Sequence, residues 1–327
     1  MRNEKIKLGI IGSGWIAEKM AITVREIADV EAYAIASRDL ATAQSFATKW
    51  NLAKAYGSYE EMLEDEDVQL VYIATPHSCH YENVRSCLLK GKAVLCEKAF
   101  TANACQAEEL IRLSEEKHVY LAEAMWTRYM PMSQKIKELV SSGIIGIPTI
   151  LSANLGYPIS HKKRLLDPAL AGGSLLDLGV YAINFASMIF GTNVKKVISS
   201  CTKTHTGVDA QNSITLVYND DKMAVLYSTM YAKTDRQGII SGEKGHLVVE
   251  NINNPQSVTL LSSDYEKIAR DECPPQITGY EYQVYASVEA LQNGWIESPY
   301  MPHAETLRIM RLMDGLREEW GIRFPFE

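Results

Sequence analysis

The 327-residue chain has 46% hydrophobic and 22% charged residues and a formal net charge of −7, which is the composition of a globular protein. A chain of this length is too long for one ordinary hydrophobic core, so we expect two domains. The net negative charge without a dense Lys/Arg cluster argues against a nucleic-acid partner, and the lack of a long uncharged apolar stretch argues against a membrane partner. Six cysteines without a CxxC pair, and no signal-peptide pattern, predict a cytoplasmic protein without a disulfide framework.

From the N-terminus to residue 122, short apolar strands alternate with segments of helical character. Residues 68–74 form a nearly unbroken apolar run, which is typical of a strand buried on both faces. Regular strand–helix alternation predicts a parallel sheet with helices on both sides, so we expect a doubly wound α/β Rossmann domain over residues 1–122. The expected strands are 7–11, 30–36, 68–74, 93–96 and 119–122, and the expected helices are 15–27, 40–50, 81–89 and one that begins after Asn103.

A glycine-rich turn links the first predicted strand to the first predicted helix. Gly12 permits the tight turn, Gly14 lets backbone approach a pyrophosphate, and Ala17 is small enough for the helix to lie close on the sheet. N–H groups at the start of such a helix hold phosphate oxygens, and a plain glycine turn without a ligand is the alternative. The sequence therefore predicts a dinucleotide site made by Gly12, Ser13, Gly14, Trp15 and Ile16.

The end of the second predicted strand bears on the choice of cofactor. Arg38 stands where a carboxylate would bind the ribose 2′-hydroxyl of NAD, and Ser37 adds a hydroxyl donor. A guanidinium group pairs well with a 2′-phosphate, so we favour NADP. NAD stays the alternative because Asp39 follows directly, and an arginine solvated on a loop is the structural alternative for Arg38.

Glu97 and Lys98 end the apolar strand 93–96. In an open parallel sheet, ligands bind outside the carboxyl ends of the strands, so we expect this pair at the mouth of the cofactor site. The Lys98 ammonium group would stabilise an oxygen that gains negative charge, and Glu97 would orient Lys98 or a cofactor ribose. A surface ion pair of little consequence is the competing interpretation.

After residue 122 the pattern changes to helices followed by several strands. Turns that contain Asn, Asp or Gly separate most of these strands, which predicts an antiparallel sheet. We therefore expect an α+β domain with a large, mainly antiparallel open sheet over residues 123–327. Its expected helices are 132–141, 175–190 and 304–320, and its expected strands are 149–157, 196–203, 213–218, 224–231, 237–241, 245–250 and 257–261.

Asp177 and Tyr181 are four residues apart in the predicted helix 175–190 and therefore share one face. A carboxylate beside a phenol holds the phenol in place, and a phenol near a substrate oxygen can exchange a proton with it. This pair is therefore a candidate for proton transfer. The competing interpretation of Tyr181 is a tyrosine at the edge of the core with a satisfied hydroxyl group.

Four motifs give the chain a resemblance to the Gfo/Idh/MocA family of nicotinamide-dependent oxidoreductases. They are the glycine-rich turn, ATPHSCH at 74–80, GKAVLCEKAF at 91–100 and GGSLLDLGVY at 172–181. Within the family, EAMWTRYMP at 123–131 and a tyrosine at position 181 in place of the usual histidine resemble the dimeric dihydrodiol dehydrogenase and NADP-dependent D-xylose dehydrogenase group. The family motif is usually Glu-Lys-Pro, so Ala99 is a departure that removes a fixed φ next to Lys98.

The resemblance implies an enzyme that moves a hydride between NAD(P) and a secondary alcohol or ketone of a sugar, polyol or cyclic diol. Lys98 and Tyr181 would then handle the proton, with Asp177 in support. The resemblance also implies a homodimer formed through the open face of the second sheet. The residues that it places near the nicotinamide ribose are Thr75, Pro76 and His80.

The segment between the two predicted domains contains flat aromatic rings and a cation, which suit a pocket for a polyol or ring diol. We assign Trp126, Arg128 and Tyr157 to the substrate, with hinge packing as the alternative for the first two. The loop with His77, Cys79 and His80 lacks the ligand spacing of structural zinc sites, so we expect no metal.

A second class of function shares the same elements. A catalytically silent dinucleotide-binding sensor or regulatory protein would keep the fold, and fold alone does not determine function. Ala99 favours this class, because it departs from the family motif beside Lys98. The presence of both Lys98 and Tyr181 favours the enzyme.

Overall fold

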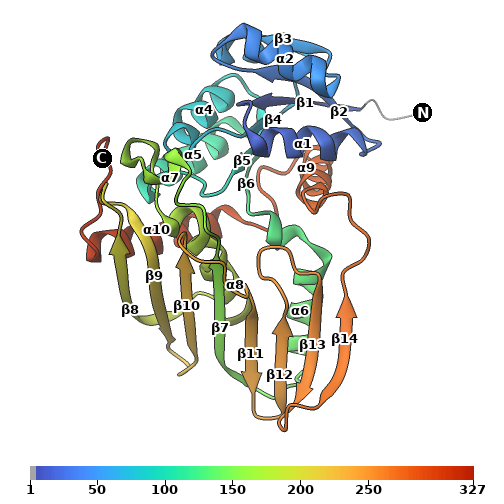
Figure 1. Ribbon diagram of the computed structural model, residues 1–327. Coiled ribbons are helices and arrows are strands. Elements are labelled where there is room, and N and C mark those ends of the chain that lie inside the picture. The colour runs from blue at the N-terminus through green and yellow to red at the C-terminus, as the bar shows by residue number, and fades with distance from the viewer. Residues whose placement is uncertain (1–4) are drawn as a thin grey trace. The chain divides into compact units, whose positions relative to one another are not determined.

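The computed structural model describes residues 5–327, which form two compact units. The first unit contains the residues up to Tyr129 together with Gln276–Met310. The second contains Met130–Pro275 and Arg311–Glu327. The chain therefore leaves the first unit and later returns to it, as the colour gradient of Figure 1 shows.

A six-stranded parallel sheet forms the centre of the first unit, in the order β3-β2-β1-β4-β5-β6. The direction of the strand order reverses between β1 and β4, which is the arrangement of a doubly wound sheet and confirms the prediction for this part of the chain. The carboxyl ends of all six strands consequently lie along one edge. The strands are β1 Ile6–Ile11, β2 Val30–Ala36, β3 Lys54–Tyr56, β4 Leu70–Ile73, β5 Ala93–Glu97 and β6 Leu121–Ala124.

Side-chain caps define where several helices of the first unit begin. Asp39 accepts a hydrogen bond from the Thr42 N–H group, and Asn103 accepts one from the Gln106 N–H group at 3.0 Å, as the capping pattern predicts. Each cap satisfies a backbone donor that the helix itself leaves open. The helices are α1 Trp15–Arg25, α2 Leu40–Trp50, α3 Tyr59–Leu63, α4 His77–Leu89, α5 Ala104–Lys117, the short η1 Trp126–Tyr129, and α9 Glu281–Asn293. The last long helix, α10 His303–Glu319, contributes to both units.

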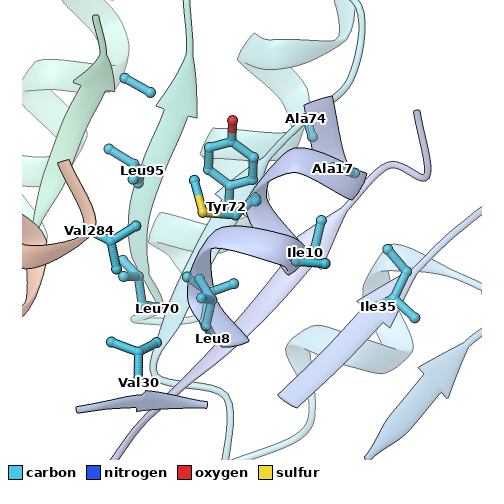
Figure 2. Close-up of a cluster of buried hydrophobic side chains, with 14 of the residues drawn as sticks. Leu8, Ile10, Ala17, Val30, Ile35, Leu70, Tyr72, Ala74, Leu95 and Val284 are labelled. Atoms are coloured by element: carbon cyan, nitrogen blue, oxygen red, sulfur yellow. The ribbon is translucent and has the colours of Figure 1, made fainter. Parts of the chain in front are cut away.

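Apolar side chains of the parallel strands pack against the helices to form the core of the first unit. Leu8, Leu70 and Leu95 are fully buried, and burying one such side chain contributes about 2 kcal/mol. Figure 2 shows Val284 of α9 close to Leu70 and Leu95. A helix far beyond β5 in the chain, α9 Glu281–Asn293, therefore completes the core that the N-terminal strands begin.

An eight-stranded sheet forms the second unit, in the order β14-β13-β12-β11-β7-β10-β9-β8 (Figure 1). β7 and β10 run parallel, and the other neighbouring pairs within residues 5–327 are antiparallel, so the prediction of a large, mainly antiparallel sheet is confirmed. The strands are β7 Pro148–Gly156, β8 Val194–Lys203, β9 Asp209–Tyr218, β10 Met223–Thr229, β11 Gly238–Gly242, β12 Gly245–Val249, β13 Ser257–Ser262 and β14 Lys267–Glu272.

Helices cover one face of this sheet. α8 packs on β7 and β10, and α6 packs on β13 (Figure 1). Along β10, buried and exposed residues alternate, which is the pattern of a sheet with one packed and one open face. The helical elements of the second unit are α6 Pro131–Ser141, α7 Lys163–Leu166, the short η2 Pro168–Leu170, the π-helical turn η3 Leu175–Gly179, and α8 Val180–Phe190.

Several elements differ from the sequence-based prediction. α4 begins at His77 rather than at residue 81, and β6 ends at Ala124, two residues beyond the predicted strand. β14 was not predicted because its charged and mostly exposed residues lack an apolar alternation. The stretch Pro168–Phe190 is long and apolar enough to cross a membrane, but 83% of its most apolar window is buried inside the protein, as in the core helix of a globular domain.

Candidate functional site

The turn after β1 has two glycines with different surroundings. Gly12 has a φ of +99°, and a Cβ atom added there would lie 2.8 Å from the Ala74 carbonyl oxygen. Gly14 is exposed, precedes the first residue of α1, and has no atom within 4 Å of an added Cβ position. The first glycine is therefore needed for the turn itself, and the second leaves room beside the start of a helix, where backbone N–H groups bind phosphate.

These surroundings predict different outcomes for two alanine substitutions. Gly12→Ala should destabilise the protein by about 1–3 kcal/mol, because alanine is strained at this φ and meets backbone. Gly14→Ala should leave the thermal unfolding temperature unchanged but weaken dinucleotide binding about tenfold, because its methyl group occupies the space that a pyrophosphate approaches. Thermal unfolding and cofactor titration measure the two effects; equal unfolding temperatures for both variants would contradict this interpretation.

Arg38 and Asp39, which follow β2, have different surroundings. Asp39 accepts hydrogen bonds from the N–H group of Thr42 at 2.9 Å and from its hydroxyl group at 2.5 Å, and these bonds lower the Asp39 pKa. This carboxylate therefore serves as the N-cap of α2. Arg38 is exposed, and Ser37 is buried, with its N–H group bonded to the Tyr56 carbonyl.

Glu97 is the last residue of β5 and lies inside the protein. The Tyr72 hydroxyl group on the neighbouring strand β4 donates a hydrogen bond to its carboxylate. Lys98 follows with a partly exposed side chain, and the Lys98–Ala99 peptide bond is cis. Because β1, β4 and β5 are adjacent parallel strands, Lys98 and the glycine turn lie at the same edge of the sheet.

His80 of α4 connects two loops at this edge. Its Nδ1 atom lies 2.9 Å from the Ala99 carbonyl oxygen, and its Nε2 atom lies 2.8 Å from the Thr75 carbonyl oxygen. Complete burial lowers the pKa of the imidazole, which favours the neutral ring. His80 thus fixes the Thr75–Pro76 segment, where Pro76 precedes the first turn of α4, against the loop that carries Lys98.

Glu123 is a buried acid that the sequence analysis did not single out. Its carboxylate accepts a hydrogen bond from the Thr306 hydroxyl group at 2.9 Å, and burial raises its pKa to about 7. Its strand partner is Cys96, one residue before Glu97. An acidic residue inside the apolar run 119–125 was the available signal, and it was missed because the predicted strand ended at residue 122.

Trp126 and Arg128, both assigned to the substrate, are buried within η1. The Trp126 ring stacks on Tyr280 with a centroid distance of 4.2 Å and an interplanar angle of 5°. The Arg128 guanidinium group forms an ion pair with Glu305 of α10. Both side chains therefore have structural partners inside the first unit, and their role toward a substrate stays a prediction.

Asp177 and Tyr181 belong to the second unit, and both are buried. The Asp177 carboxylate accepts a hydrogen bond from Arg164 at 3.1 Å. Asp177 lies in the π-helical turn η3 rather than in a regular α-helix, so the four-residue spacing does not by itself place the two side chains on one face. Single π turns inside helices are frequent at functional sites.

A second buried acid, Asp209 of β9, holds the start of this turn. Its carboxylate accepts hydrogen bonds from the Leu175 N–H group at 2.7 Å and from the Asn212 amide at 3.0 Å. Burial raises the Asp209 pKa to about 6. The contact joins residues 34 positions apart, so no local pattern in the sequence indicates it.

Tyr157 follows β7, and its hydroxyl group lies beside Arg236 and Asn253. Within residues 5–327, no cluster of three or more His, Cys, Asp or Glu side chains has the arrangement of a metal site. The His77 and His80 rings are 5.8 Å apart in an edge-to-face contact.

Two family models match the chain. Residues 6–125 match the oxidoreductase family with an NAD-binding Rossmann fold, and residues 133–248 match the Gfo/Idh/MocA C-terminal domain. A trans-1,2-dihydrobenzene-1,2-diol dehydrogenase of Mus musculus is 34% identical, with 98% of each chain covered. The chain belongs to the Gfo/Idh/MocA family. It is thus an NAD(P)-binding oxidoreductase, and the family resemblance inferred from the motifs is confirmed.

Other proteins resemble the chain in sequence or in fold. A trans-1,2-dihydrobenzene-1,2-diol dehydrogenase of Xenopus laevis is 34% identical, covering 98% of this chain and 99% of its own. The 3-ketoreductase KijD10 of Actinomadura kijaniata, in complex with NADP and TDP-benzene, superposes with a TM-score of 0.87 at 24% identity, covering 96% and 98% of the two chains. An aldose-aldose oxidoreductase of Caulobacter crescentus gives a TM-score of 0.88 at 20% identity, covering 97% and 98%. The two structures show the common fold.

Proposed function

We propose that this protein is an NADP-dependent dehydrogenase that interconverts a secondary alcohol and a ketone of a sugar, polyol or cyclic diol. The observation that carries the proposal is the shared sheet edge of Lys98 and the glycine turn, since ligands of open parallel sheets bind at that edge. The names of the relatives, which include diol dehydrogenases, a 3-ketoreductase and an aldose-aldose oxidoreductase, support this class of substrate.

Bound NADP would supply the hydride acceptor at its nicotinamide ring, and the protein supplies position and charge. In the oxidation, the C–H bond of the alcohol carbon breaks with its electron pair, and the O–H proton passes to the protein. We assign that proton to Tyr181, with Lys98 stabilising the negative charge on the substrate oxygen and Asp177 in support. The reverse transfer returns the same proton to the oxygen of the ketone.

The preference for NADP depends on the residues after β2. Asp39 caps α2 and is held there by Thr42, which leaves Arg38 as the exposed polar side chain best suited to a 2′-phosphate. This arrangement supports NADP over NAD, because a ribose 2′-hydroxyl is usually bound by a carboxylate at this position.

Arg38→Ala should raise the Kd for NADP by about tenfold or more, because a charge-assisted bond to the phosphate is lost. The Kd for NAD should change by less than about twofold. Fluorescence titration of both reduced cofactors measures the effect. Arg112→Ala is the matched control, since Arg112 is an exposed arginine on α5 that pairs with Glu116. Tighter binding of NAD than NADP by the unchanged protein would refute the assignment.

Turnover tests the proposed function directly. The protein should reduce NADP with at least one member of a panel of aldoses, polyols and trans-dihydrodiols. Tight binding of NADP without turnover on the whole panel would instead favour the silent sensor, the class to which the Ala99 departure points.

We further propose a cytoplasmic homodimer that forms through the open face of the eight-stranded sheet. Ile150 of β7 pairs with Met223 of β10, and Val225 and Tyr227 continue the same exposed row. Ile198 on β8 is 50% exposed. Apolar side chains gathered on one sheet face are typical of an interface between subunits.

Val225→Glu should convert the dimer to a monomer, because it places a charge at the centre of the apolar row. Light scattering coupled to size-exclusion chromatography gives the mass of each species. Leu89→Glu is the control, since Leu89 is exposed at the end of α4 in the first unit. A wild-type protein that stays monomeric at high concentration would exclude the dimer.

A further inference from the structure

A polar cluster in the second unit has no role in the proton transfer proposed above. The Tyr157 hydroxyl group accepts hydrogen bonds from the Arg236 guanidinium group and from the Asn253 amide, both at 3.3 Å. The guanidinium carbon lies 5.6 Å from the centre of the Tyr157 ring. Two incoming donors leave the hydroxyl proton of Tyr157 available for an acceptor outside the cluster.

The backbone at Arg236 has a rare conformation that several hydrogen bonds maintain. Its φ of +63° lies in the left-handed region. The Asn154 side chain accepts from the Arg236 N–H group at 3.1 Å and donates to Asp235 at 2.6 Å, while the Ile252 N–H group donates to the Arg236 carbonyl at 2.9 Å. Strained residues that their surroundings hold in place occur preferentially at functional sites.

One donor of the cluster, the Arg236 Nε–H group, has no matching acceptor, and the Asn253 Oδ1 atom has no matching donor within residues 5–327. Arg236 forms no ion pair with a carboxylate anywhere in residues 5–327, and its buried Nε–H group has no hydrogen-bond partner there. The neighbouring Asp235 carboxylate accepts instead from Asn154 and from the Gln237 N–H group at 3.1 Å. A purely structural cluster would satisfy these donors, whereas an uncompensated guanidinium beside a phenol donor suits an anionic oxygen group.

The cluster and the residue before the turn that leads to the helix of Tyr181 both contact the end of β10. The Tyr157 N–H group donates to the Thr229 carbonyl at the end of β10, at 3.1 Å. The preceding residue, Ser228, has its hydroxyl oxygen 2.9 Å from that of Ser174, directly before the turn that contains Asp177. A group bound at the cluster would therefore lie near the proposed proton-transfer residues of the same unit.

We propose that Arg236 and Tyr157 bind a carboxylate or phosphate group of the substrate, on a carbon other than the one oxidised. The inference rests on the proposed function and narrows its substrate class to sugar acids or sugar phosphates. Sugar acids and sugar phosphates both present anionic oxygen atoms, so the experiment includes one sugar of each kind to distinguish them.

The test compares D-glucose, D-glucuronate and D-glucose 6-phosphate with the NADP-loaded protein. At least one anionic sugar should have a kcat/KM about tenfold above that of glucose. Arg236→Asn should remove this preference by raising the KM for the anionic sugar, while kcat/KM for glucose stays the same. Asparagine is chosen because it tolerates the left-handed φ of this position, so the variant should still fold. Tyr157→Phe, which keeps the ring, should lower kcat/KM for the anion about fivefold. Arg270→Met, at an arginine paired with Glu272, should change neither ratio.

A preference for glucose in the unchanged protein, or an equal loss for neutral and anionic sugars in Arg236→Asn, would overturn the inference. Calorimetry on the NADP-loaded protein separates it from the proposed function. If no sugar is turned over, but an anionic sugar binds and Arg236→Asn abolishes that binding, the anion site stands and the dehydrogenase assignment fails. If glucose is turned over but neither anionic sugar binds, the dehydrogenase assignment stands and the anion site fails.

Discussion

Lys98→Met should lower kcat by about two to four orders of magnitude, because it removes the positive charge that we propose to lie beside the substrate oxygen. Methionine keeps the length and the apolar stem of lysine, so the cofactor site should stay intact. The Kd for NADP should therefore stay within about twofold of the original value. Stopped-flow measurement of hydride transfer isolates the chemical step from product release.

Lys90→Met is the matched control for this substitution. Lys90 is exposed at the end of α4, pairs with Glu64 at 2.5 Å, and lies eight residues before Lys98 in the chain. Its replacement should leave both kcat and KM unchanged. If the Lys98 variant has the same rate of hydride transfer as the unchanged protein, Lys98 has no part in the mechanism.

Local signals predicted most of the first unit. The glycine turn, the Asn103 cap and the buried run 68–74 each depend on residues that are close in sequence, and each has its expected structural role. α9 was missed because Val284, Val288 and Ala290 fill a core whose other buried members lie in the N-terminal 124 residues. No local pattern shows that a distant helix completes that core.

The same distinction applies to the candidate site. Lys98 was identified because a strand ends directly before it, which fixes its edge of the sheet. Glu123, Asp209 and Arg236 were not identified, since their meaning depends on partners 34 to 183 residues away or on burial that the sequence does not display. Asp39 shows a related limit: whether it faces a ribose or caps its own helix is decided by its two hydrogen bonds from Thr42.

Tyr181→Phe should lower kcat by about two to three orders of magnitude, because it removes the phenol oxygen that we propose exchanges the proton and keeps the ring. Tyr181 is buried in α8, where phenylalanine fills the same volume, so thermal unfolding should change little. Tyr218→Phe is the matched control, since Tyr218 is a buried tyrosine at the end of β9 in the same unit. A rate for Tyr181→Phe equal to that of the control would assign Tyr181 to the core edge.

The double variant Lys98→Met/Tyr181→Phe tests whether the two residues serve one proton transfer. Groups that act on the same transition state lose far less together than the sum of their separate losses, because the first substitution already removes most of what the second would. We therefore expect the double variant to be within about tenfold of the slower single variant. Fully additive losses would mean that the ammonium and the phenol, which belong to different units of the chain, contribute to separate steps, and the shared proton-transfer scheme would have to be abandoned.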